Sequence, residues 1–372
     1  MKQILQIDEV TVTPSAQFSS KFSGAPFNVL NIDLQGHVDT AASNTLALAG
    51  SFGLIGQYEL RQGQDILVSL EGPELRLLAD ADESQAEHLD PSTTSQNDEP
   101  FKATATLDFE KLGPMGTLID AGLGNAECYQ NGRFNAYTSG GSGWEAPNGG
   151  RAGTLRSHIE SVSRIPTTGY FRPKVASSKV DLGAGPSSKR SFKFEATGAT
   201  GGVLMGFLVR AYDSSGSGLA GQSSDTLVRR IVTEATTRRY KGNLSTMTWA
   251  QAKRQLAKYM GTKRDASGLL PAGFGFVPII DDAGPASLNG GLGMASGDTI
   301  EVALDTASDV EEEFGAAAGT TAATGDQAII TPLYFERVTP TGAPSTVIAG
   351  RGAASTGVRP SNRSRGRGRG RR

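Results

Sequence analysis

The sequence has little of several residue types on which common protein functions depend. Cys128 is the single cysteine among 372 residues, so no disulfide can form within the chain and no cysteine-based zinc cluster can be built. Nowhere do about 18 uncharged apolar residues follow one another, and the first twelve residues lack the apolar run of a signal peptide. We therefore expect a soluble protein that is made and used in a reducing compartment.

The residues of common catalytic and metal sites are scarce or badly spaced. His37, His88 and His158 lie far apart in the sequence and show neither HxH nor HExxH spacing, which argues against a metal site. The segment GSGLAG at 216–221 fits a dinucleotide-binding pattern, but a strand-like segment follows it where a helix is needed, so a hairpin loop is the better interpretation. We expect no enzyme activity, no catalytic residue, no metal and no cofactor.

Two further candidates have simpler explanations than chemistry. Cys128 has no basic neighbour in the sequence to lower its pKa, which favours a buried or idle thiol over a nucleophile. Asp281 and Asp282 could ligate calcium, but aspartate is also common in the turn that ends a strand. Neither feature predicts a site.

What the sequence does have is a separation of charge. The chain carries 36 basic and 38 acidic residues, but its last 22 residues hold no acid, so the body without their arginines has a net charge of about −10. A segment so rich in charge and so poor in apolar groups cannot offset the entropy of ordering, which predicts a flexible arm over 339–372. Arginine suits phosphate oxygens, so we expect nucleic-acid contacts from eight residues: Arg351, Arg359, Arg363, Arg365, Arg367, Arg369, Arg371 and Arg372.

The body shows the pattern of half-buried strands. With 48 glycines and strict alternation of apolar and polar residues, it favours an all-β fold. Alternation recurs at 27–35, 101–110, 191–196, 299–305 and 328–338. More continuously apolar segments at 46–60 and 201–212 predict strands that are covered on both faces.

Two segments have helical spacing. In 246–260, apolar residues recur every three to four positions, and Thr248 is placed to cap the helix. A shorter helix is expected from Gly72, with Pro73 in its first turn. Helices are therefore a minor part of the predicted fold.

The order of elements repeats weakly between the two halves. The strands that begin at 27–35 and at 191–198 each lead through two further strands to a helix and then to three more strands, as in a duplicated β-sandwich. We expect a first domain at 1–172, a linker at 173–190 that is rich in Pro, Gly and Ser, and a second domain at 191–338.

These features resemble a known family. The strand and helix of 66–80, the strand and loop of 99–121, and the helix followed by LLPAG within 240–282 are similar to double jelly-roll major capsid proteins of tailless icosahedral viruses, bacteriophages among them. The resemblance implies two tandem eight-stranded jelly rolls with a short helix in each. It also implies homotrimers that form pseudo-hexagonal capsomers of an icosahedral shell, in virions assembled in the host cytoplasm, with minor capsid proteins as possible partners.

Within this interpretation, the acidic loops 80–99 and 308–313 suit an outward or inter-capsomer face, and the arm suits packaged nucleic acid or anionic lipid head groups. Two alternatives remain open. One is a nucleic-acid-binding protein in which the Arg/Gly tail is the main functional part on an oligomerising β-body. The other is a carbohydrate-binding β-sandwich, for which Trp144 is a better sugar platform than Trp249, since Trp249 is expected on the packed face of a helix.

Overall fold

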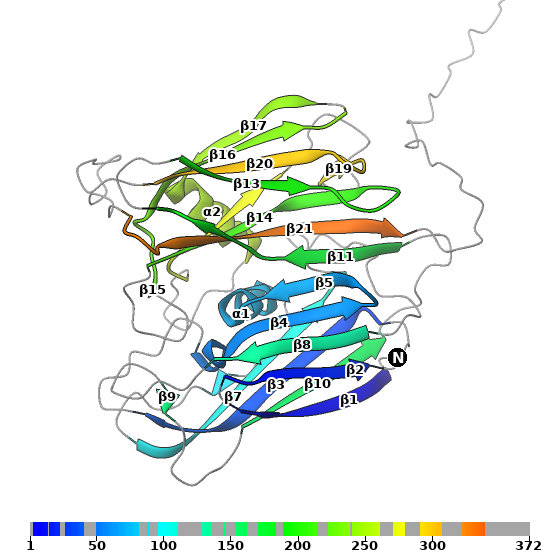
Figure 1. Ribbon diagram of the computed structural model, residues 1–372, viewed down its shortest axis with the longest axis vertical. Helices are drawn as coiled ribbons and strands as arrows, with labels where there is room; N and C mark the ends of the chain where they lie inside the picture. Colours follow the sequence, from blue (N-terminus) through cyan, green and yellow to red (C-terminus); the bar gives the residue numbers. More distant parts are fainter. Residues whose placement is uncertain are drawn as a thin grey trace, which may run out of the picture.

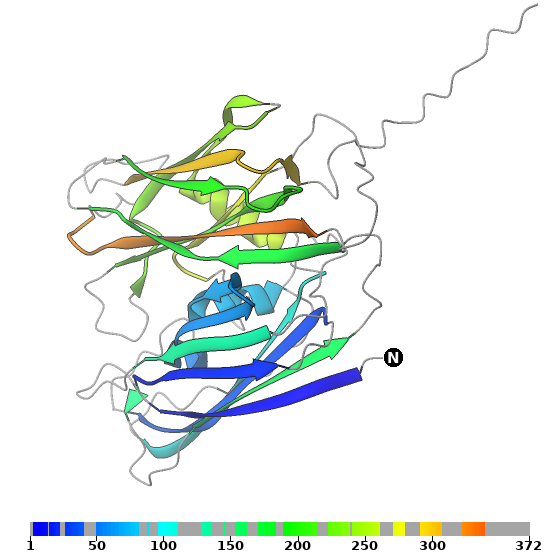
Figure 2. The ribbon, with the colours of Figure 1, turned by 45° about the vertical axis from the view of Figure 1, so that its right-hand side comes forward.

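The structure, a computed structural model, shows two β-rolls stacked along the long axis of the molecule (Figure 1). In both views α1 (Gly72–Ala81) lies where the first roll faces the second (Figure 2). The part of the chain that the structure describes comprises residues 3–13, 15–22, 27–40, 50–81, 88–89, 96–110, 128–135, 144–145, 153–161, 170–183, 189–213, 222–238, 240–260, 271–279, 291–306 and 322–338.

The first roll consists of two facing sheets. One has the strand order β1-β10-β3-β7 and the other β2-β8-β4-β5, with neighbouring strands antiparallel. Short β6 and β9 extend the first sheet. The elements are β1 (Gln3–Val12), β2 (Gln17–Phe22), β3 (Val29–Thr40), η1 (Gly50–Leu54), β4 (Ile55–Gln62), β5 (Asp65–Leu70), α1 (Gly72–Ala81), β6 (His88–Leu89), β7 (Gln96–Asp108), β8 (Cys128–Phe134), β9 (Trp144–Glu145) and β10 (Gly153–Ser161).

The second roll repeats this arrangement. Its sheets have the orders β11-β21-β14-β18 and β13-β20-β16-β17, and short β12, β15 and β19 pair with the first of them. The elements are β11 (Tyr170–Ala176), β12 (Ser178–Asp181), β13 (Lys189–Glu195), β14 (Gly202–Asp213), β15 (Gln222–Ser223), β16 (Val228–Thr236), β17 (Lys241–Thr248), α2 (Trp249–Tyr259), β18 (Phe274–Pro278), β19 (Leu292–Met294), β20 (Thr299–Thr306) and β21 (Gln327–Val338).

Each roll therefore has eight principal strands in the same spatial order. In both rolls the helix follows the fifth principal strand, which is β5 in the first roll and β17 in the second. The all-β prediction of two tandem eight-stranded jelly rolls with a short helix in each is confirmed.

The alternation in the sequence corresponds to buried and exposed faces. Leu30, Ile32 and Leu34 of β3 are fully buried, as are Ile300 and Leu304 of β20. The faces of these strands therefore follow the period of two from which they were predicted.

The predicted helices are confirmed as well. Thr248 caps α2 through a capping box, in which its hydroxyl accepts from the backbone N–H of Gln251 and the Gln251 side chain accepts from the backbone N–H of Thr248. α1 begins at Gly72 with Pro73 in its first turn.

Three details of the sequence-based prediction are wrong. Residues 50–54 form the 3-10 helix η1 instead of part of a strand. The polar segments around 88–99 and 144–145 contain β6, the start of β7 and β9 instead of being loops throughout. Finally, β17 was not recognised as a strand, because its polar residues hide the alternation. The strands before the helix were therefore matched with an offset of one, so that β3 was compared with β13 instead of β14.

The domain boundaries stay a prediction. Residues 170–176 and 178–181, which span the start of the predicted linker, form β11 and β12. Residues 339–372 lie outside the part that the structure describes. The flexibility of the arm therefore stays a prediction. None of the described helices is long and apolar enough to cross a bilayer.

Candidate functional site

The charged residues that stand out in the described structure lie where the two rolls meet. All eight arginines predicted to bind nucleic acid belong to 339–372 and lie outside the described residues. The junction between the rolls is therefore the site whose geometry can be built residue by residue.

The backbone joins the rolls through one parallel strand pair. β11 of the second roll pairs with β5 of the first, with Val175 opposite Val68 and Ala176 opposite Ser69. The N–H of Ser177 donates to the carbonyl of Ser69 over 2.8 Å. This pair merges the β2-β8-β4-β5 sheet with the β11-β21-β14-β18 sheet into one continuous sheet of eleven strands.

Apolar packing covers the junction on both sides of β14. Leu204, Phe207 and Val209 of this strand belong to the core of the second roll. Val203 and Leu208 belong instead to a cluster that includes the core of the first roll. β14 is thus buried on both faces, as its continuously apolar sequence predicted.

An inner ionic cluster reaches from this apolar contact, where Arg210 and Glu74 are buried, to the exposed side chain of Lys179. We define it as Glu71, Glu74, Lys179 and Arg210. Arg210 Nη2 donates to Glu71 over 2.8 Å, Arg210 Nε lies 2.9 Å from Glu74 Oε1, and Lys179 Nζ lies 2.6 Å from Glu71. The two acids come from the first roll and the two cations from the second, so the charges of the cluster balance across the junction.

Glu74 is the more deeply buried acid of the inner cluster. Its carboxyl is fully buried, and neither of its oxygens accepts a hydrogen bond from the described residues, although Arg210 is close. Burial raises the pKa of Glu74 from 4.5 to about 7, and the charge of Arg210 offsets only part of that increase. Glu74 is therefore the acid of the junction that titrates near neutral pH.

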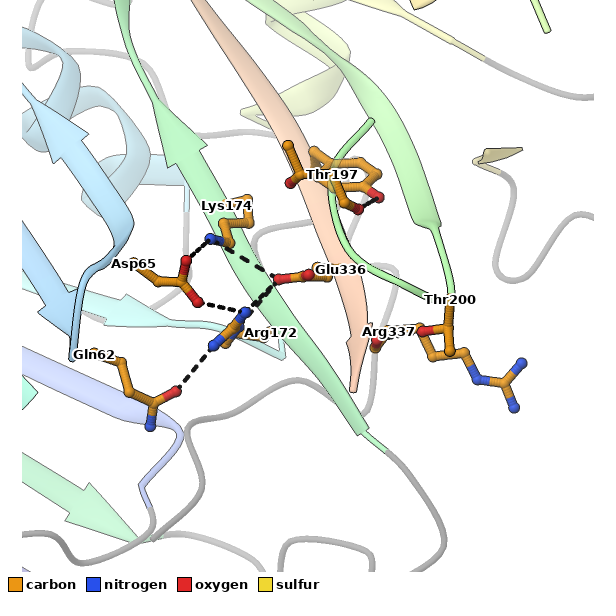
Figure 3. Close-up of polar contacts among 9 residues, drawn as sticks. Gln62, Asp65, Arg172, Lys174, Thr197, Thr200, Glu336 and Arg337 are labelled. Carbon is orange, nitrogen blue, oxygen red and sulfur yellow. Dashed lines mark hydrogen bonds and ion pairs between the residues drawn. The ribbon is translucent and has the colours of Figure 1, made fainter. Parts of the chain in front are cut away.

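An outer ionic cluster lies at the other end of the β5–β11 pair (Figure 3). We define it as Asp65, Arg172, Lys174 and Glu336. Arg172 Nη2 lies 2.6 Å from Glu336 and 2.9 Å from Asp65, while Lys174 Nζ lies 3.5 Å from Asp65. Arg172 Nη1 also donates to the side chain of Gln62 over 3.4 Å. This cluster again connects the first roll, through Asp65, to strands of the second.

The structure also locates most of the other residues considered in the sequence. Cys128 is buried, and burial raises its pKa to about 11, with smaller opposing effects from Gln62 and Arg172, so the thiol is not an activated nucleophile. Trp249 is buried on the packed face of α2, as predicted, and its indole N–H donates to Asp225 over 3.0 Å.

The histidines do not gather into a metal site in the described part of the chain. His158 Nδ1 lies 3.9 Å from Asp33, while His37 lies further along β3. No group of three potential metal ligands occurs among the described residues. The segments 216–221 and 281–282 lie outside them, and so does the side chain of Trp144.

Sequence reasoning missed the junction residues. One signal was available, because Arg210 interrupts the apolar run GVLMGFLVRAYD of β14. A charge in a strand that is covered on both faces must be paired, which predicts an acidic partner from another element. The identity of that partner depends on how α1 of the other roll is placed, and no local pattern shows this.

Comparison with known proteins agrees with this architecture. No sequence family and no curated protein matches the chain. Solved structures do match over nearly the whole length. The major capsid protein of Sulfolobus turreted icosahedral virus is 14% identical, with a TM-score of 0.56 over 91% of this chain and 96% of that one.

Two further structures show the same likeness. PBCV-1 VP54 is 10% identical, with a TM-score of 0.53 over 90% of this chain and 95% of that one. The major capsid protein P2 of bacteriophage PM2 is 10% identical, with a TM-score of 0.50 over 92% of this chain and all of that one. The resemblance found in the sequence is thus confirmed at the level of the fold: this chain has the double jelly-roll fold of viral major capsid proteins.

Proposed function

We propose that this chain is the major capsid subunit of an icosahedral virus and has no enzymatic role. Three copies would form a pseudo-hexagonal capsomer, and capsomers would form the shell of a virion assembled in the host cytoplasm. The observation that carries this proposal is the joining of two rolls of equal strand order by a continuous sheet and two ionic clusters. Two rolls of the same strand order per chain give six rolls per trimer, which suits a hexagonal lattice.

The fold comparison supports the same conclusion. Structures of viral major capsid proteins align with 90% or more of this chain. Fold alone does not define function, and the proposal therefore rests on the junction geometry together with that likeness.

The C-terminal arm would contact a polyanion enclosed by the shell. The arm carries eight arginines, whereas the body has a net charge of about −10. The arm therefore favours contact with anionic partners, which the body repels. Packaged nucleic acid and anionic lipid head groups both offer the phosphate that arginine recognises. Many arms inside one shell would bind together, because each further contact is effectively intramolecular.

Size-exclusion chromatography with light scattering and electron microscopy of the purified full-length chain test the capsid proposal. Trimers or shells support it, whereas a protein that stays monomeric over a wide concentration range overturns it. The arm is tested by deleting residues 351–372. The truncated chain should still form trimers but retain less nucleic acid or fewer anionic vesicles, with a shallower salt dependence of binding. Unchanged retention at physiological salt would contradict the arm's proposed role.

A further inference from the structure

β17 occupies the same place in the second roll that β5 occupies in the first. Within its own roll, β5 ends the strand order β2-β8-β4-β5 and β17 ends the order β13-β20-β16-β17. Each of the two strands leads directly into the helix of its roll. The correspondence extends to single residues. β5 has a bulge at Leu67 against β4, and β17 has one at Leu244 against β16. From these bulges, Val68 corresponds to Ser245 and Ser69 corresponds to Thr246.

The two strands differ in what lies on their outer edge. The outer edge of β5 is covered, because β11 pairs with it in parallel and Ser177 donates to the Ser69 carbonyl. Among the described strands, β17 pairs with β16 alone. The position that corresponds to Ser69, Thr246, is therefore an edge position without a neighbouring strand in the described part of the chain.

The difference in edge cover is accompanied by a difference in burial. Leu67 and Leu70 of β5 are at most 1% exposed. Their counterparts on β17, Leu244 and Met247, are only partly buried against the core of the second roll. An uncovered edge with partly exposed apolar side chains is a surface on which another strand can add.

β1 is the counterpart of β11 and is a suitable strand for this edge. Among the strands of its own roll, each lies at the end of the order, beside β10 in the first roll and β21 in the second. Among the described strands, β1 pairs with β10 alone, so its other edge is open too. Glu9 of β1 pairs with Arg156 at 2.8 Å within its own chain, yet 56% of its side chain stays exposed, so it can also face the exposed Lys241 at the start of β17.

We propose that β17 of one copy pairs in parallel with β1 of the next copy and so repeats between chains the β5–β11 pairing that joins the rolls within a chain. The contact is head to tail, since it uses different surfaces of the two copies, and such contacts close into rings when the rotation allows. This inference rests on the proposed function, because it names the contact that would hold the trimer together.

Thr246→Pro tests the pairing in the full-length chain. The carbonyl of Ser69 points away from β4 and toward β11, and the N–H of the same residue points to the same side. If the backbone of Thr246 has the orientation of Ser69, its N–H points away from β16. Proline at this position then removes an intermolecular donor and keeps the hydrogen bonds between β16 and β17. We expect Thr246→Pro to remain folded by circular dichroism and to lose the trimer. The matched control Thr246→Ala keeps the N–H and should form trimers like the wild type.

Hydrogen exchange identifies the occupant of the edge. In wild-type trimers, peptides covering 3–12 and 241–248 should both exchange more slowly than in the Thr246→Pro monomer. If that variant does not fold, wild-type protein diluted to monomer is the reference instead. Trimers formed by Thr246→Pro, or protection of 241–248 without protection of 3–12, would overturn the pairing and leave the capsid proposal standing. A wild-type chain that forms no trimer or shell would overturn both.

Discussion

Arg210 Nε lies 2.9 Å from Glu74 Oε1, and each of these side chains is only 1% exposed. The pair joins β14 of the second roll to α1 of the first inside an apolar contact. Taking two charges out of water is costly, and the attraction between them compensates only when the geometry is good. The junction between the rolls thus contains a contact that depends on both partners and on pH.

The first prediction concerns the pH dependence of stability. Because the pKa of Glu74 is raised from 4.5 to about 7, the folded chain holds a proton that the unfolded chain releases. The stability linked to this proton is fully present below pH 4.5 and is lost as pH rises through 7. Between about pH 5.5 and 8, the wild type should lose roughly 2 kcal/mol relative to Glu74→Gln. Urea unfolding of both proteins measures this difference, and parallel pH profiles would contradict the assignment.

The second prediction concerns the cation of the inner cluster. Glu74 is ionised at about pH 9, two units above its pKa of about 7, and there Arg210→Met leaves the buried carboxylate without its nearest positive charge and should lower the free energy of unfolding by about 3 kcal/mol. The double variant Arg210→Met/Glu74→Leu should recover most of that loss, because no unpaired charge remains. Arg230→Met is the matched control. Arg230 pairs with Asp305 at 2.5 Å but is 46% exposed, so its loss should cost about 1 kcal/mol or less.

The third prediction concerns Asp225, which holds α2 against the loop before β18. Its carboxylate accepts from the indole N–H of Trp249, from Lys253 and from the backbone N–H of Gly273 at 2.7 Å. Asp225→Ala should cost about 2 to 4 kcal/mol, since donors lose their partner. Thermal melting measures the cost, and a red shift of tryptophan emission should accompany it. Asp181→Ala, which removes one exposed turn hydrogen bond to Gly183, should change the melting temperature far less.

The fourth prediction concerns the reactivity of Cys128. A buried thiol whose pKa is raised to about 11 should react with a disulfide reagent only after the chain unfolds. The rate of labelling should therefore follow the unfolding transition in urea. Ser191→Cys, at an exposed position of β13, provides a positive control that should react at once in the native protein. Rapid labelling of native wild-type protein would show that Cys128 is accessible.

Local patterns predicted the strands and helices better than their pairing. Alternation identified β3, β7, β13, β20 and β21, and helical spacing with a cap identified α2. β17 escaped because the sequence KGNLSTMT has no apolar alternation. An edge strand with no fully buried face does not need alternating apolar residues. The same polar sequence that kept β17 from being predicted as a strand is thus typical of an edge strand, which can pair with another copy.

By itself, the sequence determined the all-β character, the duplicated order of elements and the separation of an acidic body from an arginine-rich end, because periodicity and charge are local properties of the chain. Only the tertiary structure decided that β11 of the second roll adds to β5 of the first, and that Arg210 reaches Glu71 and Glu74 across the junction. These contacts join residues more than a hundred positions apart, and their formation depends on how two folded rolls pack, which no short stretch of sequence encodes.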